Sequence, residues 1–213
     1  MIPSLIIRRD FYIRYLASSI QYLAPSIFFN MLSLNFSPFP LIETERLLLR
    51  PASLEDAPEI YFLRTDEKMI RYTNRAPDGS IEETKNKIRQ ILQMQENNES
   101  IMWGISLKDN PATLIGTIGY WRIIPEHYRA EIGYLLHPSQ WEKGIMKEAL
   151  NAVIEYAFKE MKLHSIEANI NPDNIPSAAL LEACGFIKEA YHKENYYFDE
   201  VFYDSLIYSK LNK

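Results

Sequence analysis

The feature that most constrains this chain lies between residues 130 and 148, where the sequence reads AEIGYLLHPSQWEKGIMKE. An apolar segment typical of a strand runs through a short polar turn into a helix with Gly144 at its first turn. The first N–H groups of a helix have no partner within it, and that end carries about half a positive charge. A glycine there lets an anion approach the backbone closely, so we expect a phosphate group to bind at this turn.

Composition limits the class of protein. Of the 213 residues, 47% are hydrophobic, which suits one domain with a sizeable core. The net charge of −5 argues against general binding of nucleic acid. Cys184 is the only cysteine, so an internal disulfide and cysteine-based metal sites are excluded, and the four histidines lack metal-ligand spacing. We therefore expect a cytoplasmic protein without a metal.

Residues 1–38 differ in composition from the rest, with few charges and many Ile, Leu, Phe, Tyr and Ser residues. Gln21, Pro25 and Asn30 interrupt the apolar run, which argues against a signal peptide and against a membrane-spanning helix. One interpretation is a helix over residues 5–23 that docks on the domain, a partner or a membrane surface. The interpretation that we favour is a poorly ordered extension, with Met31 as an alternative start.

Residues 39–213 are expected to form one domain of mixed α/β class. Helices are predicted at residues 53–65, 80–96, 144–156 and 177–183, with a capping box at Ser80 and Glu83. In the third of these helices, Lys147, Glu148 and Glu155 are expected to face water. Strands are predicted at residues 46–50, 101–107, 114–124, 129–136, 165–170, 186–192 and 196–208. The second to fourth strands read as an antiparallel meander, and the last two as a hairpin.

Several separated segments follow one another in the order of a known family. The strand AEIGYLL, the turn HPSQWEKG, the helix GIMKEALNAVIEYAF, the strand IEANI and the segment NPDNIPSAALLEACGF resemble the GNAT superfamily of N-acetyltransferases. Within it, LIETERLLLRP and WEKGIMKEAL resemble the branch that contains the ribosomal-protein N-terminal acetyltransferases. The resemblance covers residues 39–213. It implies a central, mostly antiparallel sheet, flanked by helices, that splays at its fourth strand to admit acetyl-CoA.

The resemblance also implies which residues bind acetyl-CoA. Its pyrophosphate would accept hydrogen bonds from the turn and helix start, at Trp141, Glu142, Lys143, Gly144, Ile145, Met146 and Lys147. Trp141 and Met146 depart from the most general pattern of the superfamily but resemble the ribosomal branch, and the Glu142 side chain should point outward. The pantetheine arm would pair with the strand at Leu135, Leu136 and His137, and would be bonded by Asn174 and Ser177. An ordinary helix start and plain helix capping are the alternatives.

Glu131 is the first candidate for the chemistry. It matches the position at which some family members keep a glutamate that takes the proton of the attacking amine. This role needs a pKa raised by burial, which a hydrophobic sheet can supply. The alternative is an exposed glutamate paired with Arg129 or Arg122.

The group that protonates the leaving thiolate is less clear from the sequence. Ser139 matches a serine that the ribosomal branch places just before the pyrophosphate turn, although a turn serine needs no such role. Many family members use a tyrosine in the short helix, and Leu181 takes its place here. Tyr134, Tyr191 and Tyr196 remain as substitutes. Cys184 has no activating base near it in sequence and is interpreted as a core residue.

The leading hypothesis is an enzyme that moves an acetyl group from acetyl-CoA to a primary amine, with the N-terminal α-amino group of a protein such as a ribosomal protein as the expected acceptor. A polyamine or an aminoglycoside is the alternative acceptor. A non-catalytic acyl-CoA sensor is the alternative class of protein, suggested by Leu181. The loop at residues 67–75 and the hairpin at residues 191–203 are expected to shape the acceptor pocket. The protein would be a monomer or a homodimer.

Overall fold

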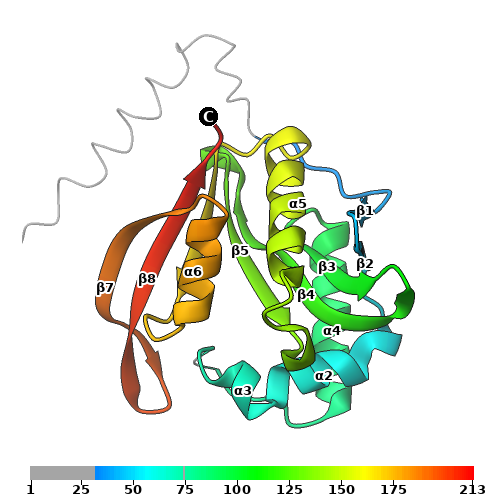
Figure 1. Cartoon of the computed structure of the whole chain (residues 1–213), viewed down its shortest axis with the longest axis horizontal. Helices are drawn as coiled ribbons and strands as arrows, with labels where there is room; N and C mark the ends of the chain where they lie inside the picture. The colour runs from blue at the N-terminus through cyan, green and yellow to red at the C-terminus, as the bar shows by residue number, and fades with distance from the viewer. Residues whose placement is uncertain (1–31, 74) are drawn as a thin grey trace, which may run out of the picture. The chain divides into compact units, whose positions relative to one another are not determined.

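The computed structural model of the chain describes residues 32–73 and 75–213 (Figure 1). The helix considered at residues 5–23 lies outside the described residues. Residues 32–213 form one compact unit. This unit includes residues ahead of the expected start at residue 39, because Phe36 is buried in its core and its backbone N–H donates to Asn98 Oδ1 over 2.8 Å.

One eight-stranded sheet forms the centre of the unit, in the order β1-β2-β3-β4-β5-β6-β8-β7 (Figure 1). Its strands are β1 (Ile42–Glu43), β2 (Leu47–Pro51), β3 (Ile101–Leu107), β4 (Asn110–Ile124), β5 (Arg129–Leu136), β6 (Ser165–Ile170), β7 (Ile187–Phe198) and β8 (Val201–Leu211). Neighbouring strands are antiparallel except for β5 and β6. The predicted mixed class, the mostly antiparallel sheet and the meander of β3, β4 and β5 are therefore confirmed.

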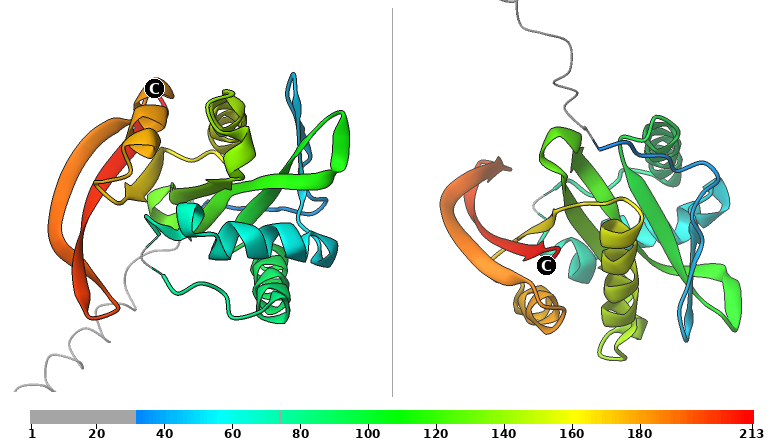
Figure 2. Two further views of the ribbon diagram at one scale, coloured as in Figure 1. Left: turned by 60° about the horizontal axis from the view of Figure 1, so that its bottom comes forward. Right: turned by 90° about the horizontal axis from the view of Figure 1, so that it is seen from above.

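Helices cover both faces of the sheet (Figure 2). One face carries α5 (Ile145–Lys159) and α6 (Ile175–Ala183), and the other carries α2 (Ala57–Thr65), α3 (Glu67–Ile70) and α4 (Ile81–Glu96). Three short turns are 3-10 helices, η2 (Leu54–Asp56), η3 (Pro125–His127) and η4 (Pro138–Gln140). The sheet thus separates two apolar cores, one under each set of helices.

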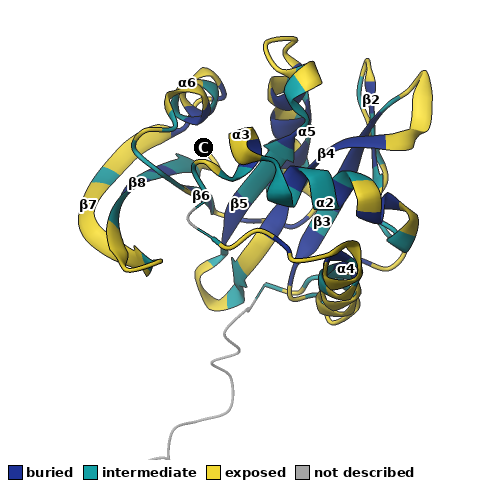
Figure 3. Cartoon of the chain, turned by 90° about the horizontal axis from the view of Figure 1, so that it is seen from below, coloured by how far each residue is buried: buried dark blue, intermediate teal, exposed yellow. Residues whose placement is uncertain are grey.

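The larger core lies between α5 and the sheet. Ala149, Leu150 and Val153 recur at helical spacing on α5, and all three are fully buried. Trp103 on β3 packs edge-on against Tyr156 of α5, with ring centres 5.3 Å apart. Figure 3 shows the buried residues in the middle of the sheet and the exposed ones on β7 and the outer side of α4. The core therefore fixes α5, and with it the turn that precedes α5, against the sheet.

The structure corrects the predicted hairpin. We expected its turn between residues 192 and 196, but β7 continues to Phe198 and the turn consists of Asp199 and Glu200. Both turn residues have positive φ, 48° and 62°, as a two-residue hairpin turn requires. The error arose because this turn lacks the glycine that usually marks such positions. The short helix α3 was also not predicted.

The sheet opens between β5 and β6. These parallel strands pair only from Arg129 with Ser165 to Glu131 with Glu167. Beyond Glu131, β5 stays paired with β4, whereas β6 stays paired with β8. Because β1 has only two residues and was not predicted, β5 is the fourth of the predicted strands. The predicted splay at the fourth strand is therefore confirmed.

Candidate active site

The turn before α5 leaves backbone donors free for an anion. Gly144 is the N-cap of α5 and has a left-handed backbone, with φ 73°. The first hydrogen bond of the helix runs from the N–H of Glu148 to the carbonyl of Gly144, 3.1 Å away. Among the described residues no side chain caps this helix end, so the N–H groups at positions 145–147 have no partner. Such an end fits a pyrophosphate group.

The side chains of the turn leave that backbone accessible. Ile145 and Met146 are buried in the larger core, so only their backbone groups face the turn. Glu142, Lys143 and Lys147 are exposed. The ammonium groups of Lys143 and Lys147 add positive charge near the helix end, and the outward position expected for Glu142 agrees with its exposure. The predicted pyrophosphate residues therefore lie together on one turn.

Trp141 and the end of β5 are joined by a hydrogen bond that the sequence did not indicate. The Trp141 Nε1–H donates to the carbonyl of Leu136 over 2.7 Å. The N–H of His137 donates to the carbonyl of Ile115, 2.8 Å away on β4. Since backbone groups alternate along a strand, those of Leu136 point away from β4, toward the gap. Leu135, Leu136 and His137 therefore border the gap, but one carbonyl there is already occupied.

Arg46 ties β2 to the turn. Its Nη1 donates to the carbonyl of Lys143 over 2.9 Å, and its Nε donates to Glu148 Oε2 over 2.6 Å. The Thr44 hydroxyl and the Arg46 backbone N–H also donate to the Glu148 carboxylate. Burial alone would raise the pKa of Glu148, but these bonds hold it below its ordinary value. The prediction that Glu148 faces water was therefore wrong.

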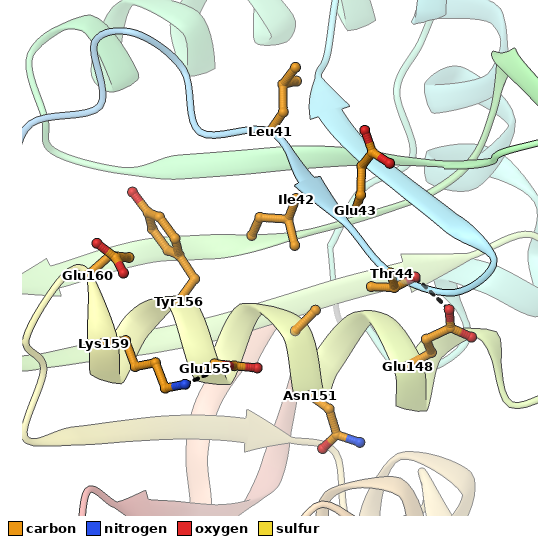
Figure 4. Close-up of a pocket in the computed structure, with 11 residues that line it drawn as sticks. Leu41, Ile42, Glu43, Thr44, Glu148, Asn151, Glu155, Tyr156, Lys159 and Glu160 are labelled. Atoms are coloured by element: carbon orange, nitrogen blue, oxygen red, sulfur yellow. Dashed lines mark hydrogen bonds and ion pairs between the residues drawn. The ribbon is translucent and has the colours of Figure 1, made fainter.

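A groove of about 590 Å³ lies between β1 and α5, and Figure 4 shows the side chains that line it. Leu41 and Tyr156 supply apolar surface, while Glu43, Glu155 and Glu160 supply carboxylates. None of the residues predicted for the site lines this groove. We therefore do not assign the groove to the reaction.

Asn174 and Ser177 lie at the start of α6. The side-chain oxygen of Asn174 accepts the backbone N–H of Ser177 over 3.2 Å, so Asn174 caps the helix. The Ser177 hydroxyl is 2.7 Å from the hydroxyl of Tyr134 on β5, so this pair links the two sides of the gap. Burial raises the pKa of Tyr134 to about 12, which keeps the phenol protonated at neutral pH.

Glu131 occupies the point at which β5 and β6 part. It is the last residue of β5 that pairs with β6, and it is 7% exposed. Burial, and after it the nearby charge of Glu167, raise the pKa of Glu131 to about 7, against the opposing effect of Arg122 and Arg129. Arg122 Nη1 lies 3.6 Å from Glu131 Oε2. The glutamate is thus ion-paired, as one alternative had it, but it is buried and not exposed.

The other candidate groups differ in their surroundings. Ser139 is exposed in η4, with its hydroxyl 2.7 Å from Nδ1 of His137, whose ring stacks on Phe62 with centres 4.6 Å apart. Tyr191 and Tyr196 lie on the exposed strand β7. Leu181 and Cys184 are buried, and burial raises the pKa of the Cys184 thiol. Of the substitute tyrosines, the structure brings only Tyr134 to the gap.

Two general features of the described ranges, 32–73 and 75–213, bear on function. They contain no helix that is long and apolar enough to cross a membrane. They also contain no group of His, Cys, Asp and Glu side chains arranged to hold a metal ion.

Comparison with known proteins identifies relatives of this chain. The family model described as acetyltransferase (GNAT) domain matches residues 46–187. The uncharacterized N-acetyltransferase YoaA of Bacillus subtilis is 36% identical over 151 residues, which are 71% of this chain and 85% of the relative. The crystal structure of ribosomal-protein-S5-alanine acetyltransferase from Vibrio fischeri is similar, with a TM-score of 0.73, 28% identity and coverage of 82% of this chain and 97% of that chain. The microcin C7 self immunity acetyltransferase MccE, solved with acetyl-CoA and AMP, has a TM-score of 0.70 and 25% identity, covering 79% of this chain and 94% of that chain.

Proposed function

We propose that this chain, which belongs to the acetyltransferase (GNAT) family, acetylates the N-terminal α-amino group of a protein, with a ribosomal protein as the first candidate. The family match and the relatives establish the coarser statement, that the chain is an acetyl-CoA-dependent N-acetyltransferase. The identity of the acceptor, the cytoplasmic setting and the roles of individual residues are the proposed part.

Glu131 is the observation that carries the proposal. Acetyl-CoA supplies an acetyl thioester that an uncharged amine nitrogen can attack. Before that attack the ammonium form of the acceptor must lose a proton, and the Glu131 carboxylate accepts it, directly or through water. A carboxylate with a pKa of about 7 is ionised in about half of the molecules at neutral pH and still binds protons well.

An α-amino group gives up its proton to Glu131 more readily than a polyamine does. An α-ammonium group has a pKa of about 8, whereas an alkylammonium such as that of lysine has a pKa of about 10.4. Proton transfer to a base with a pKa of about 7 is therefore less unfavourable for the α-amino acceptor, by roughly 3 kcal/mol. The relative from Vibrio fischeri, a ribosomal-protein-S5-alanine acetyltransferase by its description, supports a protein acceptor.

We propose that the turn at positions 141–147 holds the pyrophosphate and that Leu135, Leu136, His137, Asn174 and Ser177 border the pantetheine arm. Ser139 is the proposed donor of a proton to the thiolate, and Tyr134 is the second candidate because it keeps its proton and lies at the gap. Replacing each by Ala and Phe, respectively, separates them. Replacing the true proton donor should lower kcat without changing the affinity for coenzyme A. Replacing the other residue should change neither kcat nor that affinity.

The test is mass spectrometry of peptides incubated with the protein and acetyl-CoA. Peptides from the N-termini of ribosomal proteins should gain one acetyl group, and the same peptides with a blocked α-amino group should gain none. Glu131→Gln should slow acetylation by about 10²-fold to 10⁴-fold while coenzyme A still binds in a calorimeter. Binding of coenzyme A without acetylation of any peptide, in wild type as well, would instead support the acyl-CoA sensor. Acetylation of spermidine in preference to every peptide would support the small-amine acceptor.

A further inference from the structure

A buried ion cluster lies between α2 and α4, on the side of the sheet opposite α5. Its centre is Asp78, which is 3% exposed. The Asp78 carboxylate accepts hydrogen bonds from Arg64 Nε at 2.8 Å, from the Thr84 hydroxyl at 2.7 Å and from Lys87 Nζ at 2.7 Å. Burial opposes ionisation, but the bonds from Arg64, Lys87 and Thr84 lower the pKa of Asp78 to about 2. The oxygens of Asp78 are therefore fully used.

Arg75 adds a positive charge to this cluster without a matching acceptor. Its side-chain atoms Nε and Nη2 are buried and make no hydrogen bond within the part of the chain that the structure describes. Burial and the charge of Arg64 lower the pKa of Arg75 to about 10, against the attraction of Asp78, so the guanidinium stays charged at neutral pH. A buried charged donor without a hydrogen-bond partner is costly. An anion that accepted hydrogen bonds from Arg75 would remove this cost.

The cluster borders the face of β5 that carries Leu135. Side chains alternate along a strand, so Glu131 and Leu135 share one face of β5, and Leu135 packs against the core under α2 and α4. A small pocket of about 40 Å³ joins Leu135 and Thr117 to Arg64 and Lys87 of the cluster. In Figures 1 and 3 α3, which precedes Arg75 in the chain, lies between the end of β5 and the hairpin of β7 and β8.

We infer that Arg75 binds an anionic oxygen group, a carboxylate or a phosphate, that the acceptor carries in addition to its amine. This inference rests on the proposed function for the position of the acceptor amine at Glu131. A planar guanidinium with two unused donors matches two oxygens of one anion. Asp78 cannot accept the hydrogen bonds of Arg75, because its oxygens already accept hydrogen bonds from Arg64, Thr84 and Lys87. For a protein acceptor, the anion would be an acidic or phosphorylated residue close to the N-terminus.

The first test compares acceptor peptides that differ at one residue. Each set has the same sequence with Asp, phosphoserine or Asn at position 2, 3 or 4 from a free α-amino group. Arg75→Gln should lower kcat/KM about tenfold for the peptide with the preferred anion and less than about twofold for the Asn peptide. Arg89→Gln, an exposed arginine on α4 outside the loop at residues 67–75, is the control and should change neither. The Asp and phosphoserine arms distinguish a carboxylate from a phosphate. An equal fall for all peptides, or the same effect in both variants, would overturn the inference.

The second test does not depend on the acceptor. With coenzyme A at saturation, so that its own phosphate site is filled, inorganic phosphate should raise the melting temperature of wild type and of Arg89→Gln above that in chloride of equal ionic strength. Arg75→Gln should lose this rise, and Arg75→Lys, which keeps the charge, provides a second variant should Arg75→Gln fail to fold.

The two tests separate the inference from the proposed function. Loss of the phosphate effect in Arg75→Gln, with no peptide acetylated by wild type, would support the anion site and reject the protein acceptor. If wild type acetylates peptides but replacing Arg75 changes the anion dependence in neither test, the proposed function would stand and the anion site at Arg75 would be rejected.

Discussion

Glu131→Gln should make the protein more stable and inactive at the same time. Glutamine has nearly the shape of a protonated glutamate, and unlike glutamate it stays uncharged at every pH. In wild type, burial and Glu167 raise the pKa of Glu131 from its ordinary 4.5 to about 7. The folded protein therefore holds this proton more tightly than the unfolded chain, which means that wild type loses stability as the pH rises from about 4.5 to about 7.

The size of the effect follows from that difference. Each pH unit between the two pKa values corresponds to about 1.36 kcal/mol, so the titration of residue 131 lowers the free energy of unfolding of wild type by roughly 3 kcal/mol at pH 8 and by about 1 kcal/mol at pH 5. The side chain is 9% exposed, so solvent screening takes away little of this cost. Urea unfolding of wild type and variant at pH 5 and at pH 8 measures both values.

A control and an activity measurement complete the experiment. Glu155→Gln removes a carboxylate of α5 whose side chain is 63% exposed, and it should change stability by little at either pH. Glu131→Gln should also lower kcat/KM by about 10²-fold to 10⁴-fold, the usual contribution of a general base. A variant that is no more stable than wild type at pH 8 would show that burial does not disfavour the ionised form of Glu131. A variant with unchanged activity would show that it is not the base.

Three further predictions test the charged neighbours of Glu131 and the turn before α5. Glu167→Gln removes a charge that raises the pKa of Glu131, so the acidic limb of the pH profile of kcat/KM should move to lower pH. Arg122→Gln removes a charge that lowers this pKa, so it should move the limb to higher pH. A shift in the same direction for both variants would contradict the effects of these charges on Glu131. Gly144→Val should weaken coenzyme A binding in calorimetry more than Gly144→Asn, because asparagine adopts the left-handed backbone more readily, while a Cβ atom at this position would lie 3.6 Å from its nearest neighbour in either variant. Equal losses of affinity would argue against a backbone cause. Arg46→Met should weaken coenzyme A binding about fivefold to tenfold by releasing the Lys143 carbonyl, and Lys159→Met, which breaks an exposed pair on α5, should not.

Much of the fold could be predicted from local patterns. The meander and α5 have strong apolar periodicity, and Gly144 marks the start of α5 as an N-cap. The hairpin turn was misplaced because Asp199 and Glu200 take up left-handed backbone without the usual glycine. The helix α3, with only four residues, is too short to show a period.

Parts of the site depend on contacts between distant residues, which the sequence does not display. The burial of Glu131 could be expected from the hydrophobic strand around it. The ion pair of Arg46 with Glu148 joins residues 102 positions apart, so neither residue stood out. Arg75 lies in a segment without any motif, and its lack of a partner depends on how Asp78 is shared by Arg64, Thr84 and Lys87.

We expect the parting of β5 from β6 to limit which acyl groups can be transferred. The free edge of β5 runs over residues 132–136, about 17 Å at ~3.4 Å per residue. At one end the two strands join again at Glu131, so there is no further edge along which a longer chain can extend. If the pantetheine arm lies along this edge as proposed, the junction should limit how deep the thioester can reach. Acetyl donors should therefore be preferred over butyryl and longer ones, and moving the stop by one residue pair would change that preference and displace the base together.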